Sequence, residues 1–203
     1  MKRLGFLMLM LAVALMLGGS ALAQNVGDNS VYFTTYFSAN NTTGAPEETV
    51  RVINDGDTGA TLWSAFYVFD DSQELTECCA CSITPDCLLS ESVKQNLTAA
   101  PLTGRIPSRG VIKVISSATS DPTATKPTAG LRAWATHVQA TTVTLVPGAR
   151  VVPVVKGPWF VTETAFADSN LSAGEQALLQ NLCYYDALLS GYPCVCNLED
   201  FDY

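Results

Sequence analysis

Two groups of cysteines, about a hundred residues apart, constrain the fold of this 203-residue chain more than any other feature. The first group is Cys78, Cys79, Cys81 and Cys87, and the second is Cys183, Cys194 and Cys196. The vicinal Cys78-Cys79 pair and the Cys194-x-Cys196 pair are poorly placed to bridge within themselves. Bridges between the groups would close long loops, and each would contribute roughly 4 to 5 kcal/mol, without strict additivity.

The N-terminus indicates the compartment in which these cysteines are found. Lys2 and Arg3 precede an apolar run over residues 4–17, and Ala21-Leu22-Ala23 forms a small-x-small cleavage site. This is the pattern of a secretory signal peptide over residues 1–23, with cleavage before Gln24. We expect a secreted protein, extracellular or periplasmic, with no membrane span after cleavage. Oxidising surroundings favour disulfides over free thiolates.

Signal-peptide removal also changes the charge. The mature chain keeps nine of the eleven basic residues against all nineteen acidic ones. Such an acidic surface repels phosphate backbones, so we expect no nucleic-acid partner. The 180 residues that remain, 24–203, suit a single domain with a sizeable core.

Short apolar runs rich in Val, Ile, Thr, Tyr and Phe alternate with clusters of turn-forming residues, a pattern typical of a mainly β chain, here a β-sandwich. The predicted strands cover residues 31–37, 49–53, 61–69, 92–98, 111–116, 131–139, 142–146, 149–155 and 160–166. Both alternating sets in 61–69 are largely apolar, which predicts a central strand covered on both faces.

The C-terminal section changes to a helical period. Ser172 and Glu175 are spaced as a capping box, in which each side chain bonds the other residue's backbone N–H. Apolar residues then follow at helical spacing on one face: Leu178, Leu182, Tyr185 and Leu189. We predict a helix over about residues 171–190 that packs on the sandwich through this face, is tied on by disulfides and precedes a Cys-rich acidic tail.

Two segments carry a family resemblance. The runs Glu77-Cys78-Cys79-Ala80-Cys81 and Leu171-Ser172-Ala173-Gly174-Glu175 resemble an uncharacterised family of secreted bacterial hypothetical proteins. The resemblance implies no activity. It does imply three paired positions in each cysteine group, which leaves Cys87 as the odd thiol, either a buried, inert free thiol or a bridge between two chains.

Metal ions offer an alternative use of the same residue types. Cys-Cys-x-Cys and Cys-x-Cys spacings can hold zinc, copper(I) or an iron–sulfur cluster, but only as reduced thiolates. Asp55 and Asp57 are weak calcium ligands, because their loop lacks a spaced third carboxylate and a closing Glu. We therefore assign no metal and no cofactor.

Catalytic motifs are weak. Asp57-Thr58-Gly59 matches the string around the catalytic carboxylate of aspartic proteases, but it occurs once and also suits a turn between strands. His137 is the only histidine, so a serine or cysteine hydrolase would need it as base, yet no nucleophile motif accompanies it. We assign no catalytic residue and expect no enzyme.

Binding is the remaining class of function. Trp63, Trp134 and Trp159 could form an aromatic platform for sugars or peptides, although aromatic residues in strands usually belong to the core. Loops 40–46 and 118–130 are the expected contacts, the second being expected to be mobile. Our hypothesis is a secreted, non-enzymatic structural, adhesion or ligand-binding protein with an unknown extracellular ligand or protein partner. The alternatives are a secreted hydrolase with an unrecognised carboxylate site and a metal-binding Cys-rich protein.

Overall fold

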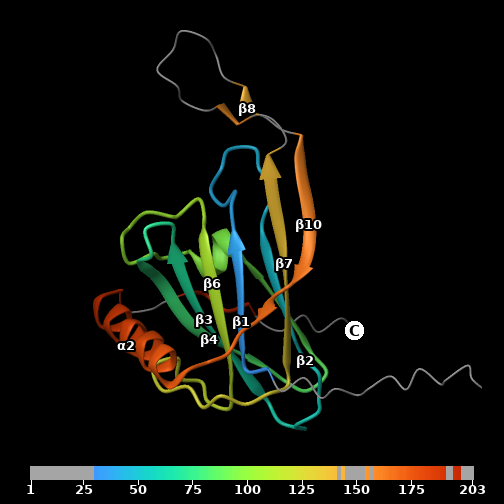
Figure 1. Cartoon of the computed structure of the whole chain (residues 1–203), viewed down its shortest axis with the longest axis vertical. Helices are drawn as coiled ribbons and strands as arrows, with labels where there is room; N and C mark the ends of the chain where they lie inside the picture. The colour runs from blue at the N-terminus through green and yellow to red at the C-terminus, as the bar shows by residue number, and fades with distance from the viewer. Residues whose placement is uncertain (1–29, 141–142, 145–153, 156–157, 191–193, 198–203) are drawn as a thin grey trace, which may run out of the picture.

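Two antiparallel sheets lie face to face, with one long helix on the outside (Figure 1). The computed structural model describes residues 30–140, 143–144, 154–155, 158–190 and 194–197. The larger sheet has the order β11-β1-β6-β3-β4. Its strands are β1 (Tyr32–Phe37), β3 (Leu62–Asp70), β4 (Leu75–Ile83), β6 (Gly110–Ser117) and β11 (Ala167–Asp168).

The smaller sheet has the order β10-β7-β2-β5. Its strands are β2 (Thr49–Asn54), β5 (Leu88–Ser92), β7 (Leu131–Ala140) and β10 (Trp159–Ala165). A short pair, β8 (Val143–Thr144) and β9 (Val154–Val155), lies beyond the β7 and β10 ends in Figure 1. The prediction of a mainly β sandwich with a C-terminal helix is confirmed.

The core fills the space between the sheets and continues on the outer face of the larger one. Strand alternation sends Val50, Val52 and Phe66 into the space between the sheets, where all three are fully buried. Tyr67 points the other way, into a second cluster under the helix. The predicted central strand over 61–69 is confirmed, because β3 lies between β6 and β4 and is buried on both faces.

One predicted strand is wrong. Residues 92–98 were expected to be extended, but Ser92 ends β5 and caps a π-helix, η1 (Val93–Leu97). The Ser92 hydroxyl accepts a hydrogen bond from the Gln95 backbone N–H at 2.9 Å. Buried Val93 and Leu97 are four apart, a spacing that suits one turn of helix as well as one face of a strand. Predicted strands 142–146 and 149–155 lie mostly outside the described residues.

The helix α2 (Ala173–Ser190) begins as expected, but only the Ser172 half of the predicted capping box is formed. The Glu175 N–H donates to the Ser172 hydroxyl at 3.1 Å. The Glu175 carboxylate does not turn back: it accepts from the Tyr32 hydroxyl at 2.9 Å and from Lys113 Nζ at 2.6 Å. The cap residue therefore also docks the helix N-terminus on β1 and β6.

The face of α2 that contacts the sheet differs from the prediction. Leu179 and Cys183 are fully buried against the larger sheet, whereas Leu178 is 51% exposed and Leu189 is 74% exposed. Tyr185 is exposed as well, and only Leu182 of the predicted face packs against the outer cluster. The bridge from Cys183 to Cys78 on β4 sets the helix rotation. Among the described residues, no helix is long and apolar enough to cross a membrane.

The tail over residues 194–197 closes one side of the sandwich. Its backbone meets η1, where the Val195 N–H donates to the Asn96 carbonyl at 3.1 Å. The Asn197 side-chain amide donates to the Ser90 carbonyl on β5 at 2.8 Å. Because Cys194 and Cys196 are bonded to β4, the tail spans the gap between the edge strands of the two sheets.

Candidate ligand site at the loop between β1 and β2

The six cysteines named by the resemblance form three bridges between the two groups: Cys78–Cys183, Cys79–Cys194 and Cys81–Cys196. Successive side chains of β4 point to opposite faces of the sheet, so its three cysteines reach different partners. Cys78 points outward and holds the helix, whereas Cys79 and Cys81 point inward and hold the tail.

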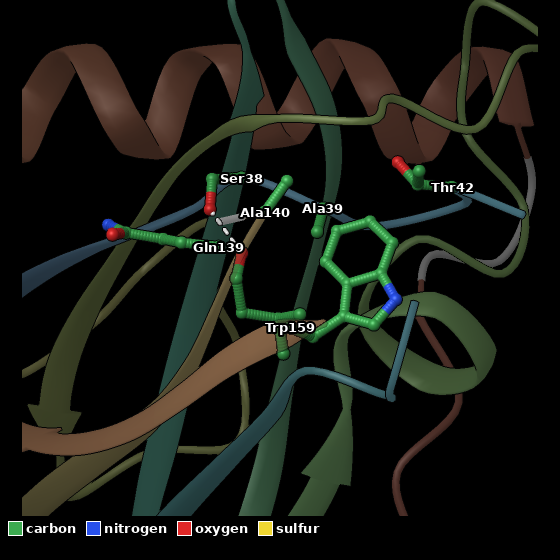
Figure 2. Close-up of a pocket in the computed structure, with 7 residues that line it drawn as sticks. Ser38, Ala39, Thr42, Gln139, Ala140 and Trp159 are labelled. Atoms are coloured by element: carbon green, nitrogen blue, oxygen red, sulfur yellow. Dashed lines mark hydrogen bonds between the residues drawn. The ribbon is translucent and has the colours of Figure 1, made fainter. Parts of the chain in front are cut away.

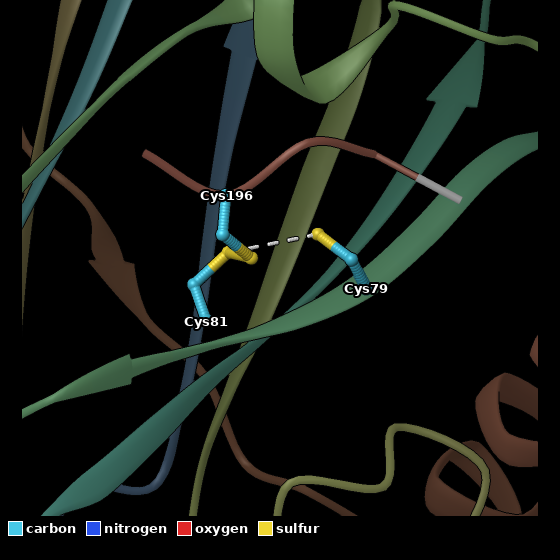
Figure 3. A group of neighbouring side chains, drawn as sticks. All are labelled: Cys79, Cys81 and Cys196. Atoms are coloured by element: carbon cyan, nitrogen blue, oxygen red, sulfur yellow. Dashed lines mark hydrogen bonds between the residues drawn. A yellow bond between two sulfur atoms is a disulfide. The ribbon is translucent and has the colours of Figure 1, made fainter. Parts of the chain in front are cut away.

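The two inward bridges are close together, with Cys79 Sγ 3.8 Å from Cys81 Sγ. Figure 3 shows Cys79 beside the Cys81–Cys196 bridge. With Cys196 these atoms form the one group of three potential metal ligands found among the described residues. Each sulfur is already bonded to another sulfur, and a disulfide offers no thiolate. In this oxidised form the cluster is a covalent staple.

The leftover thiol is Cys87, which is half-buried against the main core. Its sulfur lies 3.0 Å from the Thr84 hydroxyl, in the turn between β4 and β5. That placement gives the thiol a packing role in the turn.

The weak calcium candidates sit in a turn between β2 and β3. The Asp57 N–H donates to Asp55 Oδ1 at 3.2 Å, and Asp55 Oδ2 lies 3.5 Å from Arg132 Nε. The backbone turn closes where the Gly59 N–H donates to the Gly56 carbonyl at 2.9 Å. Asp55 thus already serves a turn and an arginine.

His137 is buried on β7 at the end of the sandwich. Its ring stacks on Tyr36 with a centroid separation of 4.2 Å, and its Nε2 lies 3.4 Å from the Thr35 hydroxyl. Burial lowers the pKa of His137 below its ordinary value, which keeps the ring neutral at physiological pH. These are the surroundings of a core histidine.

The three tryptophans do not form one platform. Trp63 lies on β3 opposite Ser82 and Ser117, in the larger sheet. Trp134 lies on β7 opposite Arg51, towards the far end of that strand from Ala140. Trp159, the first residue of β10, lines a hollow.

That hollow, of about 200 Å³, lies where the chain leaves β1 and the β7–β10 pair ends. The Trp159 indole forms one wall, and the other lining residues include Ser38, Thr42 and Gln139 (Figure 2). The Ser38 hydroxyl donates to the Val138 carbonyl at 2.8 Å, so its lone pairs remain able to accept. None of the described residues that line this hollow is ionisable, so this part of its wall suits an uncharged ligand with a flat apolar face.

A buried carboxylate fixes the loop that forms the hollow. Glu48 is 2% exposed and accepts from the N–H groups of Ser38, Ala39 and Val138, at 3.0, 3.0 and 3.2 Å. Three charge-assisted bonds to one side chain hold both ends of the loop against β7. Sequence reasoning missed Glu48, since nothing in its spacing separates it from exposed Glu47.

Buried Asn40 anchors the middle of the loop. Its amide donates to the Thr98 hydroxyl at 3.1 Å and to the Pro107 carbonyl at 2.9 Å. The next residue, Asn41, has a φ of 56°, a left-handed conformation that asparagine tolerates better than most residues. The loop is thus fixed by polar contacts before any ligand arrives.

A second hollow, of about 230 Å³, lies on the other side of this loop and shares Ala39 and Thr42 with the first. Glu47, Lys94 and Gln95 line it. The Glu47 carboxylate accepts from the Ser92 hydroxyl and, at 3.0 Å, from the Gln95 amide. The two hollows and the predicted contact loop 40–46 form one continuous region.

The other predicted contact loop, 118–130, is held in place. The Tyr67 hydroxyl donates to the Pro122 carbonyl at 2.6 Å, and Gln176 of α2 donates to the Thr125 carbonyl at 2.9 Å. The expectation of a mobile loop does not fit these contacts, because its small residues fit under the helix. This loop contacts α2 and helps to hold the helix in place.

Two further carboxyl groups are buried. Glu77 on β4 and Asp186 on α2 are both nearly inaccessible, and neither lines either hollow. Burial raises the pKa of Glu77 to about 7, with a smaller contribution from the Asp186 charge. A hydrolase needs its carboxyls to reach a substrate, and both of these are buried.

Comparisons of the chain with protein-family profiles, with curated proteins and with solved structures found no match.

Proposed function

We propose that this chain is a secreted, non-enzymatic binding protein whose ligand is a neutral saccharide held against Trp159. The observation that carries the proposal is a preorganised loop beside an aromatic wall. A sugar ring offers a flat face of C–H groups to an indole and a rim of hydroxyls to polar side chains.

Three features support this ligand class. The residues that line the hollow together with the indole include uncharged polar ones, Ser38, Thr42 and Gln139. Its volume of about 200 Å³ suits one or two small rings rather than a folded partner. Loop 38–48 is held by buried Glu48 and Asn40, so little conformational entropy is lost when the ligand binds.

Secretion is part of the same proposal. Three disulfides fit a protein of an oxidising compartment, and the signal-peptide pattern over residues 1–23 supplies the route. We place the mature protein, together with the secreted bacterial family it resembles, outside the cytoplasm, where oligosaccharides of the cell surface are within reach.

The test is a titration of the mature protein with a panel of neutral soluble oligosaccharides, followed by indole and amide NMR signals. At least one saccharide should shift the Trp159 indole and the amides of Ser38 and Thr42. Trp159→Ala should weaken binding at least tenfold, roughly the contribution of a stacked aromatic anchor. Trp63→Phe, in the other sheet, is the matched control and should bind normally.

Two outcomes would contradict the proposal. One is that no saccharide perturbs these signals at concentrations up to about 10 mM, which corresponds to negligible affinity. The other is that Trp159→Ala binds like the wild type. The saccharide should also be recovered intact after incubation, because its cleavage would favour the hydrolase alternative.

A further inference from the structure

The two sides of the sandwich differ in what covers the edges of the sheets. On the side of β4 and β5, the tail over residues 194–197 covers the gap and is bonded to β4 through Cys194 and Cys196. On the other side, the smaller sheet ends in β10, whose only partner among the described residues is β7. An open edge presents unpaired N–H and C=O groups to any strand that can align with it.

β10 is exposed on both faces as well as along its edge. Every residue from Phe160 to Ala165 is exposed, with Phe160 at 66% and Val161 at 51%. Figure 1 shows the strand lying along β7, at the margin of the molecule away from α2. Natural edge strands are usually protected by lysines, prolines or a covering segment, and Trp159–Ala165 contains no lysine or proline.

The charge of this edge suits a second copy of the chain. The whole chain has a net charge of −8, which opposes self-association elsewhere on the surface. β10 contains one ionisable residue, Glu163, and its Oε1 lies 2.8 Å from Arg51 Nη1 of the same chain. The edge is therefore locally neutral, and two acidic molecules can approach each other there.

We propose that two copies of this chain pair through β10, antiparallel and centred on Thr162, so that their smaller sheets join into one continuous sheet. Thr162 is the midpoint of Trp159–Ala165, so this register uses the whole strand. It places Phe160 opposite Thr164 of the other copy and Thr162 opposite Thr162. Aromatic–β-branched and Thr–Thr pairs are favourable across antiparallel strands, and no like charges face each other.

The symmetry of this pairing supplies a sharp test. In Thr162→Lys, two ammonium groups would lie directly opposite each other at the two-fold axis, whereas the monomer keeps an exposed side chain at an exposed position. Thr162→Glu would place two carboxylates there. A mixture of the two variants would place a lysine opposite a glutamate. Val111→Lys, at an exposed position of central strand β6, is the matched control.

The measurement is sedimentation equilibrium of the oxidised mature protein from about 1 µM to about 0.5 mM, since self-association depends on concentration. The wild type and Val111→Lys should rise towards twice the monomer mass. Each Thr162 variant should stay monomeric with a wild-type circular dichroism spectrum, and an equimolar mixture of the two should recover the dimer. A wild type that is monomeric throughout, a dimeric Thr162→Lys or a monomeric mixture would overturn the proposal.

Discussion

Glu77 shows how one buried carboxyl can make folding depend on pH. It is fully buried on β4, accepts a hydrogen bond from the Ala100 N–H, and has its pKa raised from 4.5 to about 7 by burial. Between these values the folded chain keeps a proton that the unfolded chain has lost. The contribution of Glu77 to stability is therefore fully present below pH 4.5 and is lost as the pH rises through 7.

We predict that Glu77→Gln, which keeps the acceptor for Ala100, leaves stability at pH 4 unchanged. At pH 8 it should raise the free energy of unfolding by roughly 3 kcal/mol. Urea unfolding from pH 4 to pH 8 measures the difference, with exposed Glu74→Gln as the control. An identical pH dependence for Glu77→Gln and the wild type would show that Glu77 ionises normally in the folded chain.

Glu48 is the residue on which the candidate site depends most. In Glu48→Ala the N–H groups of Ser38, Ala39 and Val138 lose their acceptor while remaining near the core. Each such loss costs about 1 kcal/mol or more, so we expect about 3 kcal/mol in the free energy of unfolding.

The variant should also shift the amide NMR signals of residues 38–48 and weaken saccharide binding. Its neighbour Glu47→Ala serves as the control, because Glu47 is exposed and bonds other side chains rather than this backbone. Equal destabilisation by the two substitutions would mean that Glu48 does not organise the loop.

At the scale of elements, α2 offers a test on two adjacent leucines. Leu179 is fully buried against the larger sheet and Leu178 is half exposed. We predict that Leu179→Ala costs roughly 2 to 5 kcal/mol, as is usual for a core leucine, whereas Leu178→Ala changes stability by less than about 1 kcal/mol. Thermal unfolding of the two variants measures both values. A larger destabilisation by Leu178→Ala than by Leu179→Ala would mean that the helix packs through the face predicted from sequence spacing.

The helix also shows which part of an element can be predicted from its sequence. Its position and its Ser172 cap follow from local chemistry, which acts within one turn. Its orientation depends on the bridge between Cys183 and Cys78, 105 residues away, and on the Glu175 contact with Lys113. Leu178 and Leu189 form a stripe at helical spacing that faces away from the sheet.

Strand β4 was missed for a related reason. Leu75–Ile83 contains three cysteines and a glutamate, and all four are buried. Their residue types do not produce the apolar pattern from which strands are predicted. The candidate site shows the same limit. Trp159 was among the predicted binding residues. Its selection over Trp63 depends on which sheet β3 joins, and its selection over Trp134 depends on the position of Trp134 along β7.

At the scale of the whole molecule, disulfides close one side of the β-sandwich, and among the described residues no strand pairs with the β10 edge on the other side. Three bridges connect β4 to the helix and to the tail, and each closes a loop of more than a hundred residues. Such bridges restrict the unfolded chain strongly, and they leave the β10 edge and the Trp159 hollow on the uncovered side. The binding proposal and the pairing proposal both depend on this division.

The most direct test of this arrangement is disulfide mapping of the exported protein by proteolysis and mass spectrometry without reduction. We predict peptides linked as Cys78–Cys183, Cys79–Cys194 and Cys81–Cys196, with Cys87 recovered as a free thiol. A bridge within either cysteine group, a bridged Cys87 or six reduced cysteines would contradict the stapled sandwich.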